Sequence, residues 1–173
     1  MKGHHRNRLR ARRVLLALAC LGFAASAHAV HTCTVGIGNL SFGAYTGSQI
    51  TSSTTMTITC SLTSGVVDNV SFTATLSTGA GSYLQRRLTH VGAPPDTLPY
   101  NLYLGTVPAI LNTNVWGDGS GATVTATGTL QLIIIFNPTR SATFTVAGAM
   151  GPVASMPTAG TYQDIIAGTV TYN

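Results

Sequence analysis

The sequence contains no glutamate and a single lysine, Lys2, and aspartate supplies all four of its acidic residues. Lysine and glutamate usually fill exposed helix positions, so their near absence leaves little to support helices. Threonine is abundant by contrast, with 27 residues, and 19 glycines accompany it. Because β-branched residues favour strands, this composition predicts an all-β fold.

The scarcity of acids also bears on catalysis. The sequence has no paired acidic residues and no Gly-x-Ser-x-Gly motif. His90, Asp96 and one of the serines can be drawn as a catalytic triad, but a triad is defined by a geometry that the sequence does not supply. We therefore expect a protein that is not an enzyme and that needs no cofactor.

The chain begins with a basic segment, continues into an apolar one and then reaches the small-residue motif Ala27-His28-Ala29. The apolar run covers residues 14–25, whereas a membrane-spanning helix needs about 20 residues. This order is typical of a secretory signal peptide. We expect residues 1–29 to direct export through the Sec pathway, and residues 30–173 to form one exported domain.

Loss of the signal peptide would change the charge of the protein. The whole chain has a net charge of +5, but the exported domain keeps only Arg86, Arg87 and Arg140 against four aspartates, which gives −1. That domain contains no run of like charge, so the sequence does not predict a nucleic-acid interface.

Three cysteines are present, and Cys20 lies within the expected signal peptide. An even pair in an exported chain predicts a disulfide between Cys33 and Cys60. Closing this loop would stabilise the fold by about 3 to 4 kcal/mol. The alternative is a metal site that includes His31, but it would need further ligands, and His90 is the only other histidine of the exported domain. We expect no metal.

Short alternating segments separated by turn residues follow one another from Cys33 to the end, and no long stretch has helical periodicity. We expect strands over residues 32–45, 54–60, 70–77, 98–104, 122–136, 142–147 and 160–173, with 83–89 as a further candidate. This pattern predicts an immunoglobulin-like β-sandwich, with a closed barrel as the alternative. The Cys-Trp-Cys order of antibody domains is absent, because Trp116 follows both cysteines.

Residues 122–136 form the longest strand pattern, and they become continuously apolar from Leu132 to Phe136. We expect this second half to be buried on both faces or covered by a partner. If it were exposed, it would be an aggregation hazard.

Residues 160–173 alternate with period two, which predicts a single terminal strand. Its mainly apolar face carries Tyr162, Asp164, Ile166, Gly168, Val170 and Tyr172. A carboxylate on such a face needs a partner, and we predict an ion pair of Asp164 with Arg86 or Arg87. The alternative is that strand twist carries Asp164 to the edge.

Several motifs in this order resemble the spore coat protein U domain family, which includes the subunits of Csu-type, or archaic, chaperone–usher pili. They are Cys33, Phe42-Gly43-x-Tyr45, Cys60, residues 98–103, residues 116–119, and Gly160-x-Tyr162-x-Asp164 followed by Val170 and Tyr172. The resemblance covers nearly the whole exported domain.

The resemblance implies a sandwich that lacks one strand and exposes a groove. A periplasmic chaperone fills the groove first, and a neighbouring subunit replaces the chaperone by β-strand addition at the outer-membrane usher. It also implies that the last strand borders the groove, which points to Gly160, Tyr162, Ile166, Val170 and Tyr172 as groove residues.

One feature departs from a strand-donating subunit. After signal cleavage only Val30, His31 and Thr32 would precede Cys33, where a donor needs about ten alternating residues. We therefore expect a subunit that accepts a strand without giving one, which suits a fibre tip, although family tip adhesins carry an additional domain. The alternative is a secreted coat or matrix protein.

A carbohydrate-binding or surface-adhesion module is a further alternative. Tyr83, Tyr103 and Trp116 lie near glycine-rich loops and could form a stacking surface. We leave Trp116 as a possible surface contact, because exposed apolar patches tend to mark interfaces.

Overall fold

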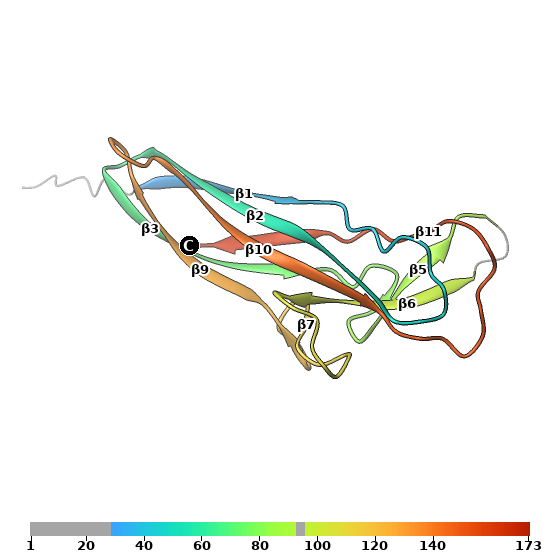
Figure 1. The fold of residues 1–173 in the computed structure, drawn as a ribbon. Coiled ribbons are helices and arrows are strands. Elements are labelled where there is room, and N and C mark those ends of the chain that lie inside the picture. The colour runs from blue at the N-terminus through green and yellow to red at the C-terminus, as the bar shows by residue number, and fades with distance from the viewer. Residues whose placement is uncertain (1–28, 93–95) are drawn as a thin grey trace, which may run out of the picture.

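The computed structural model describes residues 29–92 and 96–173, and over these residues it contains strands, turns and loops but no helix (Figure 1). Correspondingly, no helix in the described part is long and apolar enough to cross a membrane. The all-β prediction is confirmed for these residues. Apart from Ala29, the expected signal peptide lies outside them.

Nine strands form the larger sheet, in the spatial order β1-β2-β10-β6-β5-β11 with three short strands at its margin. They are β1 (Val30–Ile37), β2 (Ile50–Ser64), β4 (Gly81–Ser82), β5 (Gln85–His90), β6 (Thr97–Leu104), β7 (Val115–Trp116), β8 (Thr123–Val124), β10 (Thr139–Met150) and β11 (Tyr162–Gln163). Neighbouring strands are antiparallel, except that β7 and β8 are parallel.

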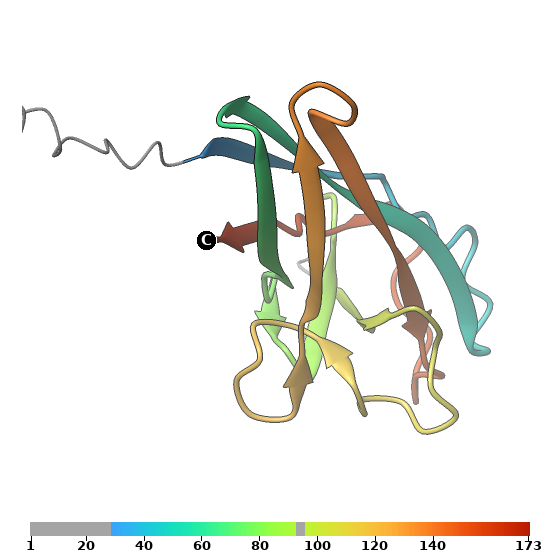
Figure 2. The same cartoon turned by 90° about the vertical axis from the view of Figure 1, so that its left-hand side faces the viewer.

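The smaller sheet has the order β12-β3-β9, formed by β3 (Val67–Leu76), β9 (Ala126–Ile133) and β12 (Gly168–Tyr172). It covers one face of the long strands β2 and β10, so the molecule is a curled two-layer sandwich (Figures 1 and 2). Buried side chains from both sheets form the core. In its middle the Phe144 ring makes edge contacts with Phe72 and Trp116, with centroids 6.1 and 6.2 Å apart.

The predicted disulfide is confirmed. Cys33 on β1 lies directly opposite Cys60 on β2, and the two sulfur atoms are bonded. The first strand is shorter than the predicted residues 32–45, because β1 ends at Ile37. Beyond it, the N–H of Gly38 bonds across to the carbonyl of Thr55, and the hydroxyl of Ser52 donates to the carbonyl of Ser41. Residues 38–45 continue as an irregular segment beside the sheet.

Period two in the strands places hydroxyl groups on the outer face of the larger sheet. Between β2 and β10 they meet in directly opposed pairs: Thr57 with Thr143 at 3.3 Å, Thr59 with Ser141 at 2.8 Å, and Ser61 with Thr139 at 2.9 Å. Such cross-strand pairs help to fix the strand register.

The strand predicted over residues 122–136 is wrong beyond Ile133, and it is not continuous before that residue. It divides into β8 and β9, and β9 ends at Ile133. Asn137 N–H and Phe136 N–H both donate to the carbonyl of Ile133, which closes a tight turn. Ile134, Ile135 and Phe136 on this turn are exposed rather than buried. Asn137 precedes Pro138, and Asn-Pro favours a turn, which explains why the chain reverses here.

Candidate functional site

The two sheets leave one side of the sandwich open. β12 pairs with β3 along one of its two edges, and β1 pairs with β2 along one of its two edges. Within the described chain, no strand pairs with the second edge of β12 or of β1. These free edges lie near each other, since the rings of His31 and Tyr172 are 5.5 Å apart. We call the free edges of β1 and β12 the open edge. An edge strand presents unpaired N–H and C=O groups that can template another strand.

Beyond the open edge, two adjoining hollows lie between residues 38–45 and the segment that follows Met156. Their volumes are about 620 and 450 Å³. Both are lined by Leu40, Phe42 and Leu88, and we call them together the twin hollow. Since these side chains are only partly buried, apolar surface remains accessible inside it.

The terminal segment was predicted as one strand, but the structure divides it between the sheets. β11 pairs with β5 in the larger sheet, residues 164–167 cross over, and β12 pairs with β3 in the smaller sheet. The alternation of half-buried and exposed residues nevertheless runs from Thr161 to Val170. The predicted inward face is therefore confirmed up to Val170, although Tyr172 is 40% exposed.

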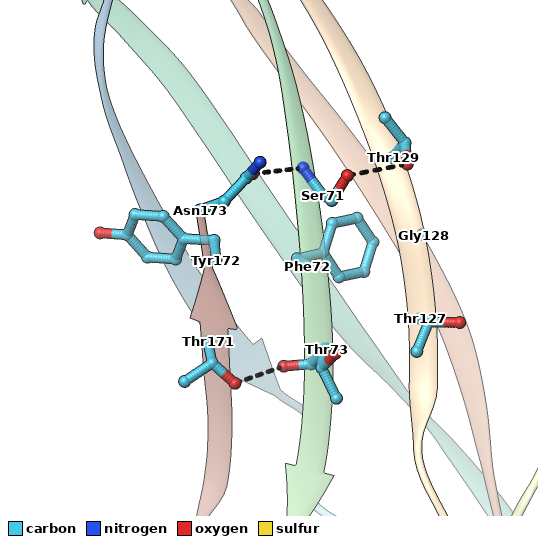
Figure 3. A pocket seen from close by; sticks show the side chains of 9 residues that line it. All are labelled: Ser71, Phe72, Thr73, Thr127, Gly128, Thr129, Thr171, Tyr172 and Asn173. Carbon is cyan, nitrogen blue, oxygen red and sulfur yellow. Dashed lines mark hydrogen bonds between the residues drawn. The ribbon is translucent and has the colours of Figure 1, made fainter.

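The predicted groove residues fall into two groups. Gly160 and Tyr162 line the larger hollow and Ile166 lines the smaller one. Val170 lies on β12 and packs against the core, whereas Tyr172 lies near the end of the open edge. Figure 3 shows Tyr172 pointing away from β3, toward the free side of β12.

Gly160 is required by its neighbour His90. A Cβ at this position would collide with the imidazole ring, so any larger residue would displace it. The same ring packs edge-on against Tyr162, with centroids 5.0 Å apart. Both ring nitrogens of His90 are buried without a hydrogen-bond partner in the described structure, so the triad drawn from His90 and Asp96 is not assembled.

Tyr162 is held by its hydroxyl group, which donates to the carbonyl of Thr158 at 2.8 Å and contacts the Asp96 carboxylate at 3.4 Å. Burial, followed by the charge of Asp96, raises the pKa of Tyr162. Asp96 accepts the N–H of Thr158 at 2.8 Å, and this bond is the main cause of its lowered pKa. The wall of the larger hollow is thus fixed by hydrogen bonds.

Asp164 has partners other than those predicted. Its carboxylate accepts the hydroxyl of Tyr100 at 2.7 Å and the backbone N–H groups of Ala80 and Ile165 at 2.9 and 2.7 Å. Burial and then the hydrogen bond to Asp164 raise the pKa of Tyr100 strongly, so its hydroxyl stays a donor. The predicted ion pair with Arg86 or Arg87 is not formed, because these nearer groups already satisfy the carboxylate.

Arg86 is fully buried and instead donates hydrogen bonds to groups in the interior. Its guanidinium donates to the carbonyl of Ser77 at 2.7 and 3.0 Å, to the carbonyl of Trp116 at 2.8 Å and to the side-chain oxygen of Asn101 at 2.9 Å. Burial lowers the pKa of Arg86. The neighbouring Arg87 is exposed.

The possible surface contact at Trp116 is wrong. Trp116 is completely buried, and its indole N–H donates to the carbonyl of Ala74 at 3.1 Å. Tyr103 is also buried. The predicted stacking surface therefore does not exist around these two residues, because tertiary packing turns both rings inward.

No pattern in the sequence predicts the polar link at the end of the open edge. His31 Nδ1 on β1 lies 2.5 Å from a carboxylate oxygen of Asp68 on β3, so a side-chain pair bridges the two sheets. The two residues are 37 positions apart and belong to no recognisable motif, so nothing local signals their contact.

Among the described residues, no group of three His, Cys, Asp or Glu side chains is arranged to hold a metal. A shallow depression of about 550 Å³ lies over β12, β3 and β9, where hydroxyl and amide groups bond to one another across the sheet (Figure 3). These bonds satisfy much of the polar surface.

Comparison with known proteins places these features in context. The model of a family described as the Spore Coat Protein U domain matches residues 19–169. No curated protein matches the sequence significantly. Among solved structures, a chaperone–tip adhesion subunit pre-assembly complex, CsuC–CsuE, from archaic chaperone–usher Csu pili of Acinetobacter baumannii is similar, with 16% identity and a TM-score of 0.48. That match covers 82% of this chain and 40% of the other chain.

Proposed function

Because the chain belongs to the spore coat protein U domain family, we propose that it is a non-enzymatic structural subunit of a chaperone–usher surface fibre. In this proposal, the exported subunit receives a β-strand from a periplasmic chaperone. A neighbouring subunit then replaces the chaperone at the outer-membrane usher. The assembled fibre serves adhesion and biofilm formation.

The observation that carries this proposal is the open edge beside the twin hollow. An added strand gains main-chain hydrogen bonds from the free edge of β12 or β1, and its alternate side chains gain apolar contacts. Leu40, Phe42 and Leu88 supply such contacts in the hollow. The arrangement thus offers both elements of strand addition along one side of the molecule.

In the proposal, the five predicted groove residues have two roles in binding the incoming strand. Val170 and Tyr172 lie on the strand whose edge would pair with the incoming strand, and Gly160, Tyr162 and Ile166 form the wall that receives its side chains. Each large apolar side chain that becomes fully buried contributes about 1.5 to 3 kcal/mol. A filled subunit should therefore be much more stable than an empty one.

Expression with and without the cognate periplasmic chaperone tests the proposal. We expect the chain alone to be unstable or aggregated, and co-expression to yield a soluble complex that co-purifies. A soluble monomer with high thermal stability and no bound partner would overturn the proposal. It would favour the alternative of a secreted coat or matrix protein.

A pair of variants locates the contact. Ile166→Ser removes an apolar side chain from the twin hollow, whereas Ile110→Ser removes the same side chain from a site that is 73% exposed and lies outside the hollow. We expect weaker chaperone binding for Ile166→Ser only. Equal binding by both variants, measured on folded protein, would count against the hollow as the partner site.

A further inference from the structure

The most exposed apolar cluster of the described chain lies on two adjacent hairpin turns. It consists of Val66, between β2 and β3, Val67, the first residue of β3, and Ile134, Ile135 and Phe136, between β9 and β10. Val66, Ile135 and Phe136 are 69%, 73% and 73% exposed. We call these five residues the apolar pole. The two hairpins project side by side at one end of the sandwich (Figures 1 and 2).

Backbone hydrogen bonds build this pole into a defined shape. The N–H of Ile134 donates to the carbonyl of Val66 at 3.0 Å, which joins the two turns. The N–H groups of Phe136 and Asn137 donate to the carbonyl of Ile133 at 3.1 and 2.8 Å. These N–H groups already have hydrogen-bond partners within the protein. They would therefore stay satisfied on entering an apolar medium, where an unsatisfied backbone group is costly.

Of the two charged side chains near the apolar pole, one already has a partner and the other is exposed. Asp68 follows Val67 directly, but its carboxylate is bonded to His31. Arg140 lies at the start of β10, directly after the β9–β10 turn, and is exposed. The pole therefore presents apolar side chains beside an available cation, while the nearby anion already has a partner.

We propose that the apolar pole docks on a phospholipid membrane surface, with its side chains at the boundary between headgroups and acyl chains and Arg140 near the lipid phosphates. A projecting apolar tip needs no complementary groove in a fluid lipid layer, whereas a protein partner would have to provide one. A long cationic side chain beside such a tip keeps its charged group in the headgroup layer.

This docking site is separate from the strand-accepting site. None of the five residues lines the twin hollow, which lies toward β5 and β11 at the other end of the sandwich (Figure 1). At the end of the open edge the two surfaces adjoin, because Val67 precedes Asp68, but they share no residue. Failure of lipid binding would leave the fibre-subunit proposal untouched, and failure of chaperone binding would leave this one untouched.

Vesicle flotation tests the proposal, with the exported chain purified as its complex with the co-expressed chaperone, or alone if it proves to be a stable monomer. The probes are vesicles of phosphatidylcholine alone and of phosphatidylcholine mixed with phosphatidylglycerol. We expect the protein to float with both, and more strongly with the anionic mixture because of Arg140. The double variant Ile135→Ser/Phe136→Ser should lower the partition coefficient by about tenfold or more, because two large apolar contacts are lost.

Ile110→Ser is the matched control, because Ile110 and Ile135 are the same residue type with the same 73% exposure at different places. We expect it to bind vesicles like the unaltered protein. Emission of the buried Trp116 reports whether each variant is folded. Absence of flotation by the unaltered chain would overturn the proposal, as would equal loss in the control. Concentration-dependent self-association lost in the double variant, without vesicle binding, would assign the pole to a second copy instead.

Discussion

The two sheets of the sandwich are joined differently on its two sides. On the closed side, two fully buried side chains of the larger sheet bridge them: Arg86 donates to the carbonyl of Ser77, just after β3, and Trp116 donates to the carbonyl of Ala74 within β3. On the open side, His31 and Asp68 bridge them with side chains that are 13% and 22% exposed, and Tyr100 of the larger sheet holds Asp164 on the crossing between β11 and β12. Because water competes less for buried bonds, the closed side should hold the fold and the open side should yield to a partner.

Removing Arg86 is expected to have the largest effect, because it breaks the closed side. Arg86→Met would leave the carbonyls of Ser77 and Trp116 without the guanidinium donor, whereas the side-chain oxygen of Asn101 would keep the N–H of Leu102. Each buried acceptor left unsatisfied costs about 1 to 3 kcal/mol, so we expect the free energy of unfolding to fall by about 4 kcal/mol in urea titrations.

Arg87→Met is the control for that change, because Arg87 is the next residue and is exposed. Its effect should stay within about 0.5 kcal/mol. Similar losses in the two variants would mean that the buried network does not distinguish the closed side.

Loss of the disulfide should come second, because it holds β1, one strand of the open edge, against β2. For the double variant Cys33→Ser/Cys60→Ser we expect a decrease of about 3 kcal/mol in the free energy of unfolding, since the loop between the cysteines is no longer closed in the unfolded chain. Unfolding of the unaltered protein with and without reductant measures the same difference. If reduction leaves the urea midpoint unchanged, β1 is held by its strand pairing alone.

The features that could be predicted from the sequence are those that depend on local pattern. The disulfide from Cys33 to Cys60 followed from an even cysteine pair, and the inward positions of Tyr162, Ile166 and Val170 followed from period two. Period two specifies which face a residue occupies but not which strand it pairs with. For this reason the crossing between β11 and β12 was not predicted.

Contacts between distant segments account for the other differences. Nothing near Trp116 in the sequence indicates that Ala74 will accept its N–H, and Arg86 finds its partners in three separate segments. A run of apolar residues such as Leu132 to Phe136 suggests burial, yet Pro138 favours a turn that exposes its end. Sequence reasoning thus predicted which face these residues occupy but not the bonds that hold them.

On the open side, Tyr100→Phe removes the hydroxyl that binds Asp164 and so loosens the crossing between β11 and β12. A hydrogen bond to a charged group contributes about 1.5 to 3 kcal/mol, and partial exposure places this one at the lower end, so we expect a loss of about 1.5 kcal/mol. Tyr172→Phe serves as the control, because Tyr172 lies on the exposed end of β12. Hydrogen exchange of residues 164–167 should quicken in the first variant and not in the second.

The smallest effect is expected for the bridge between His31 and Asp68. Its side chains are 13% and 22% exposed, and ion pairs near the surface contribute about 0.2 to 1 kcal/mol. A double-mutant cycle with His31→Gln and Asp68→Asn should therefore give a coupling energy of about 0.5 to 1 kcal/mol. If the bridge also restrains the open edge, both variants should bind the chaperone faster than the unaltered chain, because an incoming strand no longer has to displace a contact between β1 and β3. Unchanged association rates would show that the bridge affects stability but not chaperone binding.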